Sequence, residues 1–96
     1  MSLFLSQEEA QALLKRGGLV VDVRSTEEFE MGHAPGSQHL PLHILPMLAK
    51  ERLPMDRPLL VCCVSGARSH MAVLHLRKMG LDAHHLGPWT LHPDLF

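Results

Sequence analysis

The sequence has little cysteine. Its 96 residues contain two, Cys62 and Cys63, and these are adjacent. Adjacent cysteines cannot build an ordinary disulfide framework, which agrees with a reducing compartment. The N-terminus lacks the cationic start and the long apolar stretch of a signal peptide. We therefore expect the protein in the cytoplasm.

Strong charge of one sign is also missing. The formal net charge is -1, and lysine and arginine are scattered in ones and twos. This leaves no basic stripe for nucleic acid or an anionic membrane. No apolar run approaches the roughly 20 residues of a membrane helix. We therefore expect small molecules or proteins as partners, and neither nucleic acid nor a membrane.

A familiar metal-binding spacing is absent from the sequence, although it has eight histidines. The close groupings are His39 with His43 and the pair His84-His85, and Pro41 interrupts the first. Neither grouping has a cysteine or a carboxylate nearby in a zinc spacing. Scattered surface histidines are the better interpretation, so we expect no metal and no cofactor.

Two runs of apolar residues, 19–23 and 59–62, stand out in the remaining sequence. Continuous apolar runs of this length are typical of strands covered on both faces. Helical patterns alternate with such runs along the chain. We therefore predict one α/β domain over residues 1–96, with a central, mainly parallel sheet of four or five strands and helices on both faces.

Shorter signals predict the other elements. Ser6 with Glu9, and Ser25 with Glu28, are capping boxes that begin helices. A stripe of Ala72, Val73, Leu76 and Met79 predicts a helix that begins at about Ser69. Short strands are expected at residues 3–5, 38–40 and 83–86, and a short helix at residues 46–51.

A loop at residues 63–68 joins the second apolar run to the helix that follows it. A strand, a tight loop and a helix in this order aim backbone N–H groups and the positive end of the helix dipole at one point. A cysteine at that point should react as the thiolate, so Cys63 is the candidate nucleophile. The alternative is a buried structural thiol, because free cysteine is among the most buried residue types.

The spacing of Cys63, Gly66, Arg68 and Ser69 resembles the active-site loop of the rhodanese-like sulfurtransferases. The resemblance covers most of the chain. It includes residues 20–24 with Glu28-Phe29, residues 32–37 and 40–42, and Gly80 with Leu86-Gly87 before Trp89. It implies a rhodanese-like fold and a thiosulfate sulfurtransferase type of enzyme.

The resemblance also implies roles for the loop residues. Cys63 would take a sulfane sulfur from thiosulfate or a persulfide, hold it as a persulfide and pass it to cyanide, a thiol or a protein. The substrate-binding residues would be Val64, Ser65, Gly66, Ala67, Arg68 and Ser69.

Several of these residues have a physical role of their own. Gly66 permits a backbone angle that other residues resist. Arg68 would bind an anionic donor or donate to the loop carbonyls, and Ser69 would be the helix N-cap. Position 64 is often basic in relatives and is valine here, which puts thiosulfate in doubt as the physiological donor.

Two other functions remain open. Cys62 with Arg68 and Ser69 satisfies the Cys-x5-Arg-Ser pattern of a cysteine phosphatase or arsenate reductase, with Cys62 as nucleophile. We prefer the register of Cys63, in which Gly66 follows three residues later, and we interpret Cys62 as a core residue of a strand. A non-catalytic interaction module is the second possibility, although such modules commonly lose the cysteine.

Residues outside the loop are expected to have structural roles. Asp22 and Arg24 follow the first apolar run and could face the same rim as the loop. Residues in such places more often cap a helix or form a structural pair. His33 lies in a Gly-His-x-Pro-Gly turn and should make a structural hydrogen bond.

Overall fold

A parallel sheet of four strands forms the framework of the computed structural model, which describes residues 4–64, 66–92 and 95. The strands lie in the order β2-β1-β3-β4. Their bounds are β1 (Leu19–Asp22), β2 (Gln38–His39), β3 (Leu59–Cys63) and β4 (Ala83–Pro88). All three pairings are parallel. The two continuous apolar runs are therefore the two central strands, as predicted, and β1 ends one residue earlier than expected.

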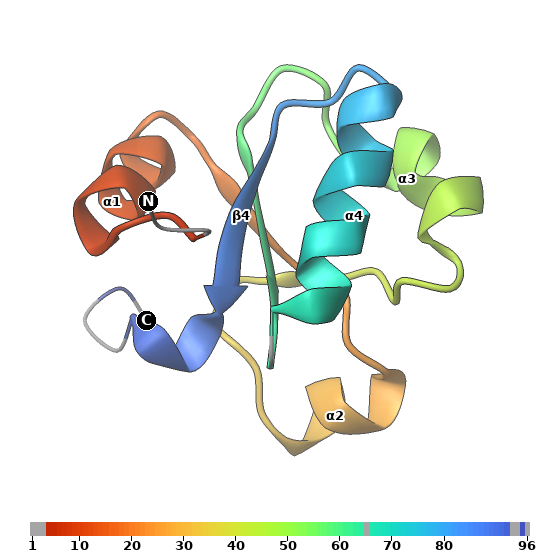
Figure 1. Ribbon diagram of the computed structural model, residues 1–96, viewed down its shortest axis with the longest axis horizontal. Coiled ribbons are helices and arrows are strands. Elements are labelled where there is room, and N and C mark those ends of the chain that lie inside the picture. The colour runs from red at the N-terminus through yellow and green to blue at the C-terminus, as the bar shows by residue number, and fades with distance from the viewer. Residues whose placement is uncertain (1–3, 65, 93–94, 96) are drawn as a thin grey trace.

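Helices cover both faces of this sheet. They are α1 (Gln7–Lys15), α2 (Thr26–Met31), α3 (Leu45–Arg52) and α4 (Ala67–Lys78), and a short 3-10 helix, η1, spans Trp89–Leu91. Figure 1 shows α1 on one side of the sheet, and α3 and α4 on the other. Both predicted capping boxes are present, at Ser6 and Ser25.

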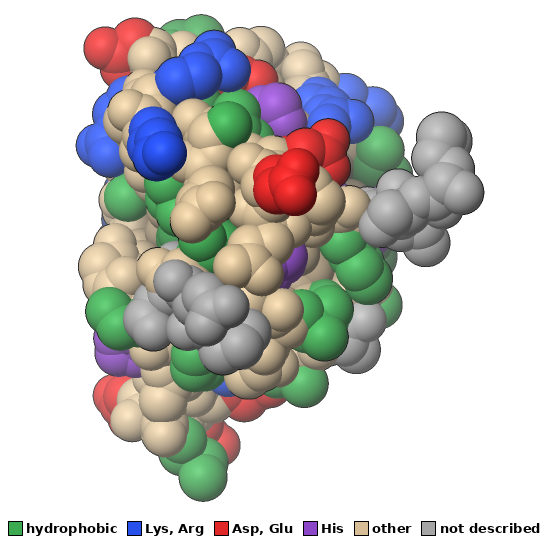
Figure 2. Space-filling view, turned by 90° about the vertical axis from the view of Figure 1, so that its left-hand side faces the viewer, with side chains coloured by type: hydrophobic (Ala, Val, Ile, Leu, Met, Phe, Trp, Pro, Cys, Tyr) green, Lys and Arg blue, Asp and Glu red, His purple; other side chains and the backbone are tan. Residues whose placement is uncertain are grey.

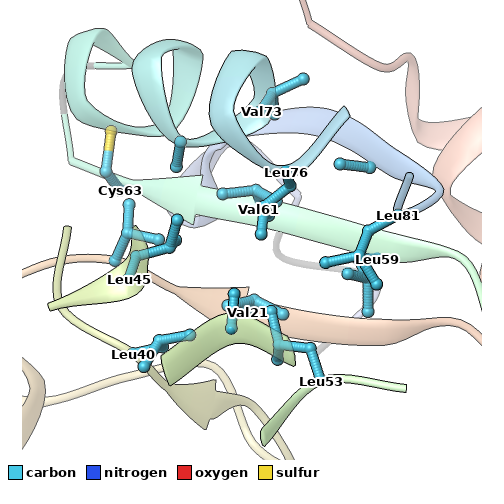
Figure 3. Packing of buried hydrophobic residues seen from close by; sticks show 14 residues of the cluster. Val21, Leu40, Leu45, Leu53, Leu59, Val61, Cys63, Val73, Leu76 and Leu81 are labelled. Carbon is cyan, nitrogen blue, oxygen red and sulfur yellow. The ribbon is translucent and has the colours of Figure 1, made fainter. Parts of the chain in front are cut away.

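Alternation along β3 divides the core into two layers. Val61 and Cys63 pack in the cluster that includes residues of α3 and α4, whereas Leu60 and Cys62 pack in the cluster that includes residues of α1. Successive side chains of a strand point to opposite faces. The two adjacent cysteines therefore lie on opposite sides of the sheet, and Figure 3 shows the sulfur of Cys63 on the side of α4.

Several predicted elements need correction. The helix expected at 46–51 spans Leu45–Arg52, the strand expected at 38–40 spans Gln38–His39, and β3 includes Cys63, which was assigned to the loop. Helix α4 begins at Ala67, two residues before the predicted start at Ser69, because Gly66 turns the chain at once in a left-handed conformation with φ +93°. Of the predicted strand 3–5, Leu3 lies outside the described residues. Phe4 and Leu5 are not in a strand, although the Leu5 N–H donates to the His85 carbonyl at 2.9 Å. Strand β4 extends two residues beyond the predicted end.

The described surface has charges of both signs. Figure 2 shows the face with α1, where lysine and arginine side chains lie among aspartate and glutamate side chains and do not form one basic patch. No helix in the described part of the chain is long and apolar enough to cross a membrane.

Candidate active site

Cys63 is the last residue of the central strand β3, and its sulfur lies against the first turn of α4. The Gly66 N–H donates to the Cys63 Sγ at 2.9 Å, and the Ser69 Oγ is 3.2 Å from the same sulfur. An N–H donor and a helix N-terminus both favour negative charge on the group that they face. The contacts around Cys63 therefore suit a thiolate. The side chain is fully buried, so the groups around the sulfur must move before a reactant can touch it.

Gly66 has two reasons to be glycine. Its φ of +93° lies in the left-handed region, which side chains with a Cβ avoid. A Cβ at this position would also lie 2.9 Å from the ring of Phe4. The direction of the Gly66 N–H toward the sulfur therefore depends on the absence of a side chain.

Ser69 is in the first turn of α4 and is not the N-cap that the sequence predicted. Gly66 holds the N-cap position, so Ser69 falls three residues into the helix. Helical side chains tilt toward the N-terminus of their helix. The buried hydroxyl of Ser69 consequently reaches back to the Gly66 carbonyl at 3.2 Å and to the Cys63 sulfur. It also lies 2.6 Å from Nε2 of His85, on β4.

Arg68 forms an ion pair that joins α4 to α2. Its Nη1 and Nη2 donate to the two carboxylate oxygens of Glu28 at 2.5 and 2.9 Å. Hydrogen bonding to Arg68, followed by the bond to the Ser25 backbone, lowers the pKa of Glu28 to about 2. This pairing with Glu28 was not foreseen from the sequence.

A cavity of about 300 Å³ adjoins Arg68. The segments after β1 and β2 line it together with the start of α4, through Val23, Ser25, Pro41, Leu42, His43 and Arg68. It therefore lies beyond the carboxyl ends of the strands, where ligands bind in parallel α/β sheets. The loop that follows Cys63 leaves the sheet at the same rim.

Two of the remaining loop residues are exposed to solvent. Val64 is 53% exposed and Ala67 is also exposed, so both reach the surface of the loop. Ser65, a predicted substrate-binding residue, lies outside the described residues. Val64 brings no charge to the loop.

Cys62 is poorly suited to be a nucleophile. It lies on the sheet face opposite to α4 and is fully buried. Burial is the first cause that raises the pKa of its thiol, and the nearby Asp22 carboxylate raises it further. These surroundings favour the neutral thiol, which is the weaker nucleophile.

The residues beside the loop have the structural roles that were predicted for them. Arg24 donates from Nη2 to Asp22 at 2.8 Å and to the Gly32 carbonyl at 2.7 Å, which fixes the end of β1. Nδ1 of His33 lies 2.7 Å from the Phe29 carbonyl.

Among the residues that the structure describes, no three His, Cys, Asp or Glu side chains could hold a metal ion together.

Two contacts of the site escaped the sequence analysis. Glu28 was noted as a helix cap and as part of a resemblance, and His85 only as one of a pair of histidines without a metal-binding spacing. Their partners, Arg68 and Ser69, lie 40 and 16 residues away along the chain. No spacing rule for a single helix or hairpin covers such distances.

The fold and the site together define a class. A parallel sheet with helices on both faces, and a cysteine enclosed by a loop at the end of a central strand, is a rhodanese-like arrangement. The family model described as "Rhodanese-like domain" matches residues 6–87. The chain belongs to the rhodanese-like domain family.

Two named sulfurtransferases agree with this assignment, and a further similar structure carries a different description. The chain is 40% identical over 75 residues to the thiosulfate sulfurtransferase GlpE of Pseudomonas syringae. The aligned region covers 78% of this chain and 70% of the relative. The human single-domain sulfurtransferase TSTD1 has a similar structure, with a TM-score of 0.75, 25% identity and coverage of 94% of both chains. A protein of unknown function from Rhodopseudomonas palustris, described as a possible tyrosine phosphatase, also has a similar structure. Its TM-score is 0.74 at 28% identity, and the alignment covers 96% of this chain and 80% of that protein's chain.

Proposed function

We propose that this protein is a sulfurtransferase that carries a sulfane sulfur on Cys63. The observation that carries the proposal is the position of the Cys63 sulfur at the end of β3, with the Gly66 N–H donating to it at 2.9 Å. The names of the curated relatives support this reaction, because they are thiosulfate sulfurtransferases. Thiosulfate is accordingly one candidate donor, and a persulfide is the other.

The proposed reaction has two displacements. In the first, the Cys63 thiolate attacks the outer sulfur of thiosulfate, the sulfur–sulfur bond breaks, and sulfite leaves with the bonding electron pair. In the second, cyanide or a thiolate attacks the outer sulfur of the Cys63 persulfide, and the Cys63 thiolate leaves. The Gly66 N–H would stabilise the charge on the cysteine sulfur at the start and at the end of the cycle.

Each remaining loop residue has a proposed part in binding. The exposed residues Val64 and Ala67 would contact the reactants, together with Ser65. Gly66 and Ser69 would hold the sulfur. Arg68 would contribute through the cavity that it lines, which is the candidate site for the part of the donor or acceptor that does not react.

The alternatives have less support. A phosphatase that used Cys62 would need that side chain on the face of α4, and it lies on the opposite face. A non-catalytic module would have no need for a cysteine whose sulfur accepts a backbone N–H. The cytoplasm remains our proposed location, and the two free cysteines suit a reducing compartment.

Mass spectrometry of the intact protein tests this function. The wild type should gain one sulfur atom after treatment with thiosulfate and lose it again to cyanide, with formation of thiocyanate. Cys63→Ser should gain none, because a serine oxygen cannot form a persulfide, and Cys62→Ser should still gain one. A sulfur adduct that requires Cys62, or phosphatase activity that the Cys63→Ser variant retains, would overturn the proposal.

A further inference from the structure

Three side chains form a continuous row from the reactive sulfur to a histidine. The Ser69 Oγ lies 3.2 Å from the Cys63 Sγ and 2.6 Å from the His85 Nε2. The His85 ring is half-buried on β4, and Phe4 packs edge-on against it with ring centroids 4.8 Å apart. The row therefore joins the strand β4 to the sulfur through one hydroxyl group.

The hydrogen atoms in this row depend on the state of the sulfur. Ser69 has one hydroxyl hydrogen and three neighbours, namely the Cys63 sulfur, the Gly66 carbonyl and the His85 ring. A thiolate cannot donate, so it must receive the hydroxyl hydrogen. The contact between Ser69 and Nε2 then needs a hydrogen on the nitrogen. A thiolate at Cys63 thus requires a hydrogen on Nε2 of His85. If the neutral ring carries its hydrogen on Nδ1, Nε2 can gain this hydrogen from Ser69, and the ring becomes an imidazolium.

We propose that His85 is a positioning residue that takes up, through Ser69, the proton that Cys63 loses when it becomes a thiolate. The S–H bond breaks as an O–H bond forms on Ser69, and the original O–H bond of Ser69 breaks as an N–H bond forms at Nε2. One proton moves from sulfur to nitrogen and no electrons are lost. The products are a thiolate and an imidazolium, which attract one another. The inference rests on the proposed function, since it concerns the same sulfur.

The relay fits both displacements. Cys63 enters the first displacement as a thiolate and leaves the second one as a thiolate, so the proton can stay on His85 through the whole cycle. While it stays there, the Nε2–H holds Ser69 in the orientation that donates to sulfur.

The groups that face the His85 ring decide how strongly it can be charged. From α4 come the Ser69 hydroxyl and the ring of His70, whose centroid is 5.7 Å from that of His85. From β3 comes Cys63, which His85 reaches through Ser69. The N-terminal segment contributes Phe4, which has no charge. A charged His70 would oppose the charge on His85, so His70 belongs in the test.

The test follows the ultraviolet absorbance of the thiolate as a function of pH in a Cys62→Ala background, where Cys63 is the single cysteine. The chain has no tyrosine, so tyrosinate does not overlap with this signal. His85→Gln is the decisive variant, because the glutamine amide can donate to Ser69 but cannot take up a proton. We expect thiolate to form about one pH unit higher in His85→Gln than in the parent. Ser69→Ala should show a similar shift, since it interrupts the row.

His84→Gln is the matched control. His84 is the neighbour of His85 on β4, and its Nε2 lies 2.8 Å from Asp82, so the change removes a histidine outside the row. His70→Gln removes the opposing ring and should move the transition slightly lower or leave it unchanged. A His85→Gln transition equal to that of the parent, a Ser69→Ala transition equal to that of the parent, or an equal shift in His84→Gln would overturn the relay.

This titration needs no sulfur donor. If His85→Gln raised the thiolate transition as expected and the wild type accepted no sulfur, the proposed function would be rejected and the relay would stand. If the wild type transferred sulfur and His85→Gln did not shift the transition, the relay would be rejected and the proposed function would stand.

Discussion

Arg68 and Glu28 form an ion pair with two hydrogen bonds between residues 40 positions apart, at 2.5 and 2.9 Å. The pair connects the first turn of α4, which holds the Cys63 sulfur, to α2. Glu28 also caps α2 through Ser25, so a single carboxylate fixes one helix and ties it to another. The candidate active-site loop is therefore fixed by an ion pair to a helix that lies outside the strand-loop-helix unit.

We predict that this pair stabilises the fold above about pH 4.5 and that the contribution is lost toward about pH 2. The pKa of Glu28 is lowered to about 2 in the native state, whereas an unfolded glutamate titrates near 4.3. Acid therefore protonates the unfolded state first, and native stability falls across that window. The side chains are 36% and 34% exposed, which limits the effect to at most about 1 kcal/mol.

Urea unfolding of wild type and Glu28→Gln over this pH range measures the contribution. Glutamine keeps the capping hydrogen bonds but has no charge, so the two stabilities should converge as the pH falls. Glu27→Gln, at an exposed neighbouring position, controls for a general loss of acidic charge. A difference between wild type and Glu28→Gln that does not change with pH would contradict the prediction.

Cys62 should matter for packing and not for sulfur transfer. It is fully buried on the α1 side of the sheet. Removing its sulfur in Cys62→Ala should cost about 1 kcal/mol of unfolding free energy through the small cavity that remains. Cys62→Ser should cost more, on the order of 1–3 kcal/mol, because it buries a hydroxyl in an apolar layer.

Both Cys62 variants should still form the persulfide in intact-mass measurements. Urea unfolding should rank them with Cys62→Ser below Cys62→Ala. Loss of the sulfur adduct in a folded Cys62→Ala protein would show that Cys62 takes part in the chemistry.

Gly66→Ala should destabilise the protein by more than Gly36→Ala does. Both glycines have a left-handed φ, +93° and +79°. A Cβ at Gly66 would meet the Phe4 ring at 2.9 Å, whereas a Cβ at Gly36 would meet nothing within 4 Å. Gly36→Ala should therefore cost only backbone strain, about 1 kcal/mol, and Gly66→Ala should reach about 2–3 kcal/mol.

A double-mutant cycle checks the physical reason. In a Phe4→Ala background the extra cost at Gly66 should shrink, because the ring that the new Cβ meets is gone. Equal costs at the two glycines in the wild-type background would mean that contact with Phe4 is unimportant.

The sequence was sufficient for features that depend on local pattern. The apolar runs 19–23 and 59–62 identified both central strands, and the capping boxes at Ser6 and Ser25 identified two helix starts. The end of the second run also placed Cys63 correctly at the carboxyl end of its strand.

The sequence was insufficient for features that depend on the backbone conformation of one residue or on contacts between distant elements. Serine is a favoured N-cap, so Ser69 was chosen, but the left-handed conformation of Gly66 begins α4 earlier. The contacts of Arg68 with Glu28 and of Ser69 with His85 arise only when α2 and β4 pack beside α4. Such contacts depend on the whole fold and leave no local pattern.

The last prediction concerns the charge beside the sulfur. Val64 is 53% exposed, so it supplies an accessible position on the loop without charge. Arg68 is already paired with Glu28, which leaves less of its charge for an anionic donor. We therefore expect wild type to bind thiosulfate weakly, and Val64→Arg to improve its apparent affinity by about 0.5–1 kcal/mol. A persulfide donor with less charge should respond less.

Steady-state kinetics with both donors, at low and high salt, separate charge from shape. Val64→Gln is the control, because it lengthens the side chain without adding charge. Salt should reduce the gain in Val64→Arg, since screening weakens an exposed interaction between charges. If Val64→Gln gave the same gain, or if salt left the gain in Val64→Arg unchanged, the side chain at position 64 would act through its shape or through the motion of the loop, and its charge would be irrelevant.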